Sequence, residues 1–106
     1  LDNLLSQGVA KKVDAMCLQG TRLPQGGQWE TNDWLIYCSP RSHNQAMDGL
    51  LIAISKFKFS RSNIRCVHEW MVGRLMGIRI TTREGRFQDD FYIIAIGYMN
   101  SYIHTL

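Results

Sequence analysis

The spacing of apolar residues predicts one helix followed mainly by strands. Leucine and valine side chains fall on one side of a helix over residues 1–12. Gly8 weakens that helix, because a glycine inside a helix costs about 1 kcal/mol. Continuous or alternating apolar runs typical of strands follow at residues 13–19, 34–38, 49–55, 71–82 and 91–98.

Polar segments between these runs predict how the strands are joined. A polar connection at 41–48 separates the second and third runs, and a turn region at 81–90 separates the last two. We therefore expect each of these two pairs to form an antiparallel hairpin. Residues 20–28, with three glycines and Pro24, have the composition of a loop, and residues 56–70 show no clear pattern. The order of elements favours a layered α/β or α+β fold.

Composition limits the class of protein. The 106 residues are 45% hydrophobic, which is typical of one globular domain, and no run of about 18 apolar residues predicts a membrane span. Cys17, Cys38 and Cys66 are odd in number and far apart, so they predict free thiols in a reducing intracellular compartment. The chain starts at Leu1 without an initiator methionine. We expect a fragment of a longer protein or a processed chain, which is also compatible with import into an organelle.

The net charge of +3 is unevenly distributed. Residues 41–86 hold nine Lys/Arg and three Asp/Glu, whereas the rest of the chain holds three basic and six acidic residues. Such a basic stretch either meets phosphate or an acidic partner, or forms a solvated face. A total of +3 is modest for a domain that binds polyanions, so nucleic-acid binding is not favoured. The candidates for a basic face are Lys56, Lys58, Arg61 and Arg65.

Aromatic residues and one Cys-x-His pair are further candidates for chemistry. The aromatic side chains either stack on bases or pack in the core, and their apolar strands favour the core. Any that are exposed mark a contact surface. Alternation along a strand puts Cys66 and His68 on one face, but two ligands do not make a structural zinc site, so no metal site is predicted. The aromatic residues concerned are Trp29, Trp34, Tyr37, Trp70, Tyr92 and Tyr98.

Three short motifs follow one another along the chain: CLQGTR at 17–22, GLLIAISK at 49–56 and FYIIAIGY at 91–98. They resemble the segments LQETR, GVAILLSK and a strand ending in Y-x-P of the endonuclease/exonuclease/phosphatase superfamily. The likeness is strongest to the abasic-endonuclease-like domains of non-long-terminal-repeat retrotransposons. It implies two packed, mostly antiparallel sheets flanked by helices, of which this chain is about the N-terminal half.

The resemblance also implies magnesium-dependent phosphodiester hydrolysis, in which a carboxylate holds the metal and a His–Asp pair activates water. Gly20 occupies the position of the metal-binding glutamate and provides no carboxylate. Arg22 and Tyr98 match two positions near the phosphate, although Asn100 replaces the expected proline. The family's asparagine, Asp-x-Asn and Ser-Asp-His motifs have no counterpart in these 106 residues.

These observations favour a catalytically incompetent, retroelement-derived subunit of a larger assembly, without a metal cofactor. Strands such as 49–56 and 91–97 are apolar on both faces, so we expect protein partners to cover the sheet faces and expect the isolated chain to aggregate. One alternative is the front half of a magnesium-dependent DNA endonuclease that nicks DNA for retrotransposon insertion. A second alternative is a nucleic-acid-binding module that uses the basic stretch.

Overall fold

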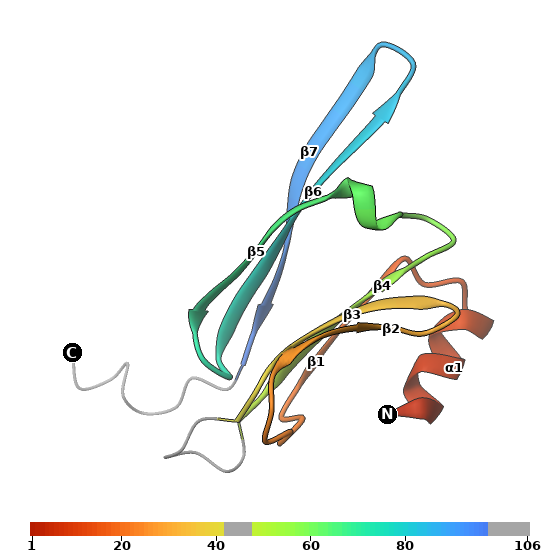
Figure 1. The fold of residues 1–106 in the computed structure, drawn as a ribbon. Coiled ribbons are helices and arrows are strands. Elements are labelled where there is room, and N and C mark those ends of the chain that lie inside the picture. Colours follow the sequence, from red (N-terminus) through yellow and green to blue (C-terminus); the bar gives the residue numbers. More distant parts are fainter. Residues whose placement is uncertain (42–47, 98–106) are drawn as a thin grey trace.

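The computed structural model describes residues 1–41 and 48–97, which form one helix and two antiparallel sheets (Figure 1). The chain is therefore of the layered α+β type that the sequence predicts. Within the described residues, no helix has the length and apolar character needed to cross a membrane. In chain order the elements are α1 (Asp2–Ala10), β1 (Ala15–Gln19), β2 (Gly27–Glu30), β3 (Trp34–Ser39), β4 (Leu50–Ser55), a 3-10 turn (Arg61–Asn63), β5 (Ile64–Met71), β6 (Leu75–Glu84) and β7 (Phe87–Ile96).

The first sheet has the strand order β1-β4-β3-β2, with every neighbouring pair antiparallel. Its two central strands, β3 and β4, pair in a register that places Tyr37 opposite Ile52, and all their residues are buried. This pairing confirms the hairpin predicted from the runs at 34–38 and 49–55. The predicted strand at 13–19 is shorter, and it is a half-exposed edge strand instead of one buried on both faces.

The second sheet has the order β5-β6-β7. Strands β6 and β7 pair from Leu75 opposite Ile96 to Glu84 opposite Phe87, which confirms the second predicted hairpin. The predicted turn over 81–90 was wrong, because only two residues separate the strands. Gly85 has a φ of 60°, the sign needed at the first central position of a type II′ turn. The polar residues that indicated a turn lie on the arm of this hairpin, which projects beyond the first sheet (Figure 1).

Two further strands lie where the sequence indicated none. Strand β2 occupies part of the predicted loop at 20–28 and pairs with β3 at the sheet edge, where all four of its residues are exposed. Strand β5 lies in the segment without a clear pattern, and two register irregularities interrupt its pairing with β6. An exposed edge and an interrupted register both weaken the period-two pattern on which strand prediction depends.

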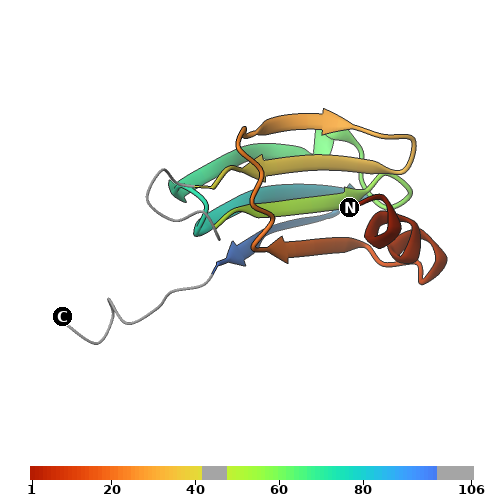
Figure 2. The ribbon, with the colours of Figure 1, turned by 90° about the horizontal axis from the view of Figure 1, so that it is seen from below.

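The first sheet is covered on both faces by the chain itself (Figures 1 and 2). On one face, Leu5 of α1 packs with residues of β3 and β4 such as Trp34 and Leu51. On the other face, Ile52 and Ile54 pack against Met76, Ile78 and Ile80 of the second sheet. The expectation that an outside partner must cover the strand at 49–56 was therefore wrong. The last strand differs, because only its inner face is covered.

Polar contacts join the two sheets at one end. The fully buried Ser39 hydroxyl donates to Glu69 Oε2 at 2.8 Å and accepts from the Gly73 N–H at 2.7 Å. Beside it, Arg74 Nε donates to Asp48 Oδ2 at 3.1 Å, and the side chain of Asp48 is 4% exposed. These contacts tie the end of β3 to the turn between β5 and β6.

Candidate interaction surface

Gly20 lies directly after β1 with a φ of 68°, in the left-handed region. Its N–H donates to the Gly49 carbonyl at 2.9 Å, and the Arg22 N–H donates to the Asp48 carbonyl at 3.0 Å. The backbone thus holds this segment against the start of β4. Tyr98, the other residue of the resemblance near a phosphate, lies outside the described residues.

A carboxylate beside the segment that follows Gly20 is already engaged. Asp48 accepts a backbone hydrogen bond from this segment, and its carboxylate is bound to Arg74. Among residues 1–41 and 48–97, no group of three or more His, Cys, Asp or Glu lies close enough to hold one metal ion. Position 20 itself offers a metal only backbone atoms, which are poor substitutes for a carboxylate ligand.

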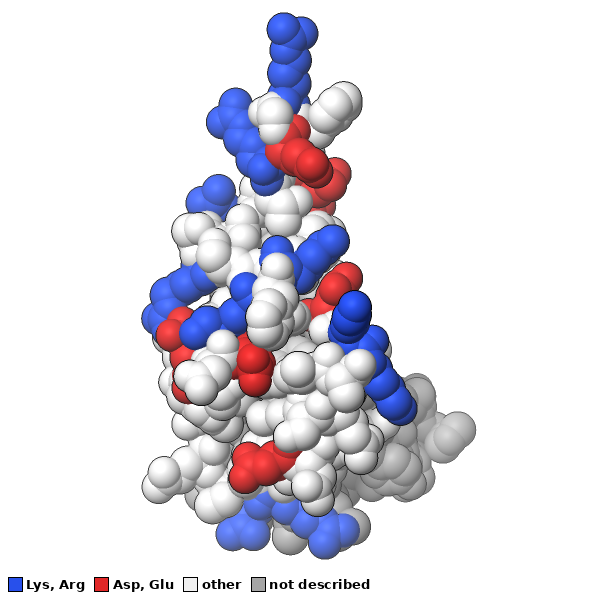
Figure 3. All heavy atoms as spheres, turned by 90° about the vertical axis from the view of Figure 1, so that its right-hand side faces the viewer, with Lys and Arg blue, Asp and Glu red and all other residues white. Residues whose placement is uncertain are grey.

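The predicted basic face is divided by ion pairs. Arg61 Nη2 lies 3.0 Å from a carboxylate oxygen of Glu30, and Lys56 Nζ lies 3.9 Å from the other one. Arg65 is exposed and is close enough to Asp90 to influence the pKa of that carboxyl. Figure 3 shows basic and acidic side chains interspersed on the face it presents, so the basic stretch forms no single patch there.

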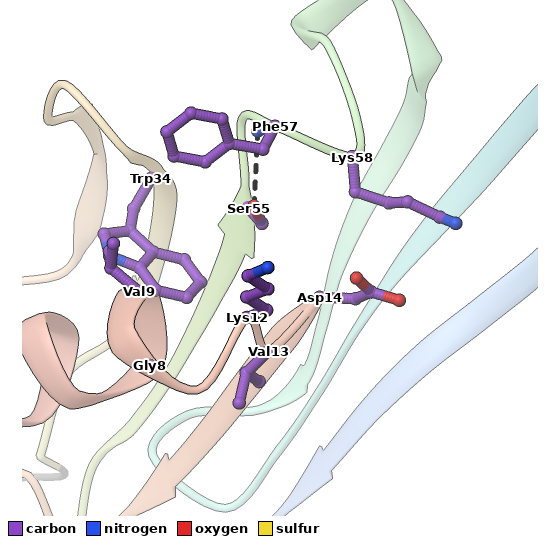
Figure 4. A pocket seen from close by; sticks show the side chains of 9 residues that line it. All are labelled: Gly8, Val9, Lys12, Val13, Asp14, Trp34, Ser55, Phe57 and Lys58. Carbon is purple, nitrogen blue, oxygen red and sulfur yellow. Dashed lines mark hydrogen bonds between the residues drawn. The ribbon is translucent and has the colours of Figure 1, made fainter.

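The fourth basic candidate, Lys58, borders a pocket of about 380 Å³ between α1 and the end of β4 (Figure 4). Its apolar lining includes the Trp34 indole and the ring of Phe57, whose backbone N–H donates to Ser55 Oγ at 3.2 Å. Lys12 and Asp14 complete its charged lining. Asp14 lies before the first residue of β1, so the strand separates it from Gly20 at the other end.

The most distinctive surface of the described chain is the face of the second sheet that points away from the first sheet. We call it the outer face. Strand alternation assigns its residues, because Met76, Ile78, Ile80 and Ala95 point inward into the core. The outer face includes Cys66, His68 and Trp70 of β5, Leu75, Arg79, Thr81 and the backbone of Gly77 on β6, and Asp90, Tyr92, Ile94 and Ile96 of β7.

Residues 1–41 and 48–97 leave apolar side chains of the outer face exposed. Relative exposures are 50% for Trp70, 48% for Tyr92, 50% for Ile94 and 58% for Ile96. By contrast, Trp34 is 2% exposed and Tyr37 is 6% exposed, which confirms core packing for these two aromatics. A contiguous exposed group of aromatic and branched side chains is typical of a binding surface.

The absence of a side chain at Gly77 shapes the middle of this face. A Cβ atom built on Gly77 would lie 2.6 Å from Cη2 and Cζ3 of Trp70, so the indole occupies the space above the middle strand. The His68 ring stacks on Trp70 with centroids 5.1 Å apart and an interplanar angle of 7°. Tyr92 approaches the same imidazole at 6.0 Å from β7. The three rings therefore form one aromatic cluster across the sheet.

An ion pair joins β6 to β7 on the outer face. Arg79 Nε donates to Asp90 Oδ1 at 2.9 Å, and a second guanidinium nitrogen binds the other carboxylate oxygen. The hydrogen bond from Arg79 holds the pKa of Asp90 below its usual value, and the Thr81 hydroxyl lowers it further. Arg79 is thus engaged by Asp90 on the adjacent strand β7, and the exposed Arg65 is close enough to lower the pKa of the same carboxyl.

Comparison of the chain with protein-family models, curated proteins and solved structures finds no match in any of the three. The likeness to the endonuclease/exonuclease/phosphatase superfamily therefore depends on the motifs in the sequence and stays a prediction.

Proposed function

We propose that this chain is a non-catalytic interaction subunit with an endonuclease-like architecture, and that it binds a protein partner through the outer face. The observation that carries the proposal is the half-exposed group Trp70, Tyr92, Ile94 and Ile96 on one side of a sheet. Nothing in the described part of the chain packs on that side. Burying such apolar side chains against a partner lowers the free energy, because it removes their surface from water.

One feature supports the endonuclease-like architecture of the proposal, and a second supports the lack of catalysis. Two antiparallel sheets and a flanking helix are compatible with the sandwich that the resemblance implies. Within that likeness, Gly20 provides no carboxylate at the position of the metal-binding glutamate, and its left-handed φ disfavours a side chain there. Arg22 alone supplies neither a base nor a metal ligand.

A protein fits this face better than a nucleic acid does. Aromatic rings stack on bases, but single-strand binders combine such rings with a positively charged groove. Here Arg79 is paired with Asp90, and the aromatic cluster continues into the aliphatic side chains of Ile94 and Ile96. Aliphatic surface is matched by apolar protein surface and not by phosphate.

The free energy of burying these four side chains indicates how large the contact with the partner must be. Fully burying a large apolar side chain contributes about 1.5–3 kcal/mol, so four half-exposed ones contribute roughly 3–6 kcal/mol. Micromolar affinity requires about 8 kcal/mol net of the costs of association. The four residues therefore form the centre of a larger interface, whose rim adds the remaining contacts.

A site-specific photo-crosslinker tests this proposal in the cells from which the chain comes. We expect benzoylphenylalanine at position 94 to give one major covalent product with a protein. The same group at position 57, an exposed site beside the α1 pocket, should give none. No product at position 94, or the same product at both positions, would contradict the proposed surface.

Activity provides the second arm of this test. The purified chain should not nick supercoiled plasmid in Mg²⁺ above the level seen in EDTA. Nicking that requires Mg²⁺ and copurifies with the chain would favour the alternative of an endonuclease domain.

A further inference from the structure

A thiol and an imidazole meet on the outer face. Cys66 Sγ lies 3.0 Å from His68 Nε2, and both side chains are half-buried. The two residues are separated by one position on β5, so strand alternation directs both toward the same side. The stacking of His68 on Trp70 and its contact with Tyr92 fix the orientation of the imidazole.

This pair has the chemistry and spacing of half a zinc site. Thiolate and imidazole are the ligands that Zn²⁺ prefers in closed tetrahedral sites. With Zn–S of about 2.3 Å and Zn–N of about 2.0 Å, a tetrahedral ion holds its sulfur and nitrogen ligands roughly 3.5 Å apart. The observed 3.0 Å is half an ångström shorter, a difference that a small rotation of the Cys66 side chain removes.

The other half of the site is not found in the described chain, where no third ligating residue joins the pair. A second copy related by a two-fold axis brings the same two ligands, because a two-fold interface joins identical patches. The surrounding side chains, Trp70, Tyr92 and Ile94, are apolar and exposed, so pairing would bury them around the ion.

We propose that two copies of this chain pair through their outer faces around one Zn²⁺ held by Cys66 and His68 of each copy. The inference rests on the proposed function, to which it adds the identity of the partner and the metal. Each thiol releases its proton to solvent on binding, and the histidines bind as neutral imidazoles. Two thiolates balance the charge of Zn²⁺, so the site as a whole is electrically neutral within an apolar interface. The nearby Arg79 is already neutralised by Asp90.

Light scattering coupled to size-exclusion chromatography tests the proposal on the full 106-residue chain. In EDTA we expect the mass of a monomer, 12.2 kDa. With ZnCl2 we expect twice that mass, with one zinc per two chains by elemental analysis. Co²⁺ in place of zinc should give the intense visible bands of a tetrahedral site and a thiolate-to-metal band in the near ultraviolet.

Cys66→Ser and His68→Gln should each weaken the metal-dependent dimer by more than the roughly 10–100-fold that loss of a supporting group costs a metal site. The matched control is Cys17→Ser, which removes the exposed thiol on β1 and should dimerise like the wild type. Circular dichroism establishes that each variant is folded, and the Co²⁺ spectrum of the wild type is independent of any variant.

Three results overturn the inference: a monomer that binds zinc, a dimer that forms equally in EDTA, or variants that keep the metal-dependent dimer. The crosslinking experiment at position 94 tests the proposed function independently of zinc. If position 94 crosslinks to a different protein while zinc leaves the chain monomeric, this inference fails and the proposed function stands. If position 94 gives no product and zinc gives no dimer, both fail.

Discussion

Single glycines decide what the two candidate sites of this chain can hold. At Gly77, the missing side chain makes room for the Trp70 indole and so creates the aromatic cluster of the outer face. At Gly20, a φ of 68° allows the chain to leave β1 and turn toward Gly49. The first glycine builds a surface, whereas the second occupies the position at which the resemblance expects a metal ligand.

Gly20→Glu tests whether position 20 accepts a carboxylate. We expect the free energy of unfolding to fall by about 1–2 kcal/mol, because a side chain in the left-handed conformation costs that much. Gly20→Asn is the matched control, since asparagine tolerates this conformation better and should lose less. Urea denaturation measures both variants. A Gly20→Glu variant as stable as the wild type, or one that gains Mg²⁺-dependent plasmid nicking, would contradict this account of the site.

At the scale of elements, α1 approaches the first sheet closely because Gly8 faces it. A Cβ atom at Gly8 would collide with Met16 Sδ and would lie 2.8 Å from Cζ2 of Trp34. The glycine that weakens the helix in the sequence is thus the residue that lets the helix pack on the sheet. Since Trp34 is 2% exposed, its ring has little freedom to move away from an added methyl group.

Gly8→Ala should therefore destabilise the protein despite the better helix propensity of alanine. The propensity gain is about 1 kcal/mol, whereas overpacking costs about 1–3 kcal/mol, so we expect a net loss of about 1 kcal/mol. Ser6→Ala, at an exposed position of the same helix, should instead gain a few tenths of a kcal/mol. Thermal unfolding followed by circular dichroism compares them. A Gly8→Ala variant more stable than the wild type would show that the helix can move away from Met16 and Trp34 at little cost.

The sequence predicts best those elements whose apolar pattern follows from burial. Strands β3 and β4 are buried throughout, and their unbroken apolar runs predicted them and their pairing. Strand β2 is exposed throughout, so it carries no such pattern. The charged residues and register irregularities of β5 had the same effect.

The candidate site was predictable only in part for the same reason. Alternation predicted that Cys66 and His68 share a face, and their 3.0 Å contact confirms it. Without an assigned β5, however, nothing in the sequence placed Trp70 over Gly77 or beside Tyr92. The outer face is formed by cross-strand neighbours, and cross-strand distances depend on a register that the sequence did not reveal.

At the scale of the whole molecule, the two sheets are joined by an apolar core and by buried polar contacts, among them those of Ser39. Ser39 belongs to the first sheet, whereas its two partners, Glu69 and Gly73, belong to the second sheet and its turn. The hydroxyl both donates and accepts, so it satisfies a buried N–H and an acidic side chain at once. A buried donor without an acceptor costs about 1–3 kcal/mol.

Ser39→Ala should lower the free energy of unfolding by about 1–3 kcal/mol, because it leaves the buried Gly73 N–H without its acceptor. The Glu69 carboxylate is exposed and regains water, so it adds little to the loss. Ser62→Ala, at an exposed hydroxyl in the 3-10 turn, is the control and should change stability by less than about 0.5 kcal/mol. Hydrogen exchange of the Gly73 amide reports the link directly and should become faster in Ser39→Ala alone. If stability and exchange both stay at wild-type values, the two sheets are held together by their apolar core without this hydroxyl.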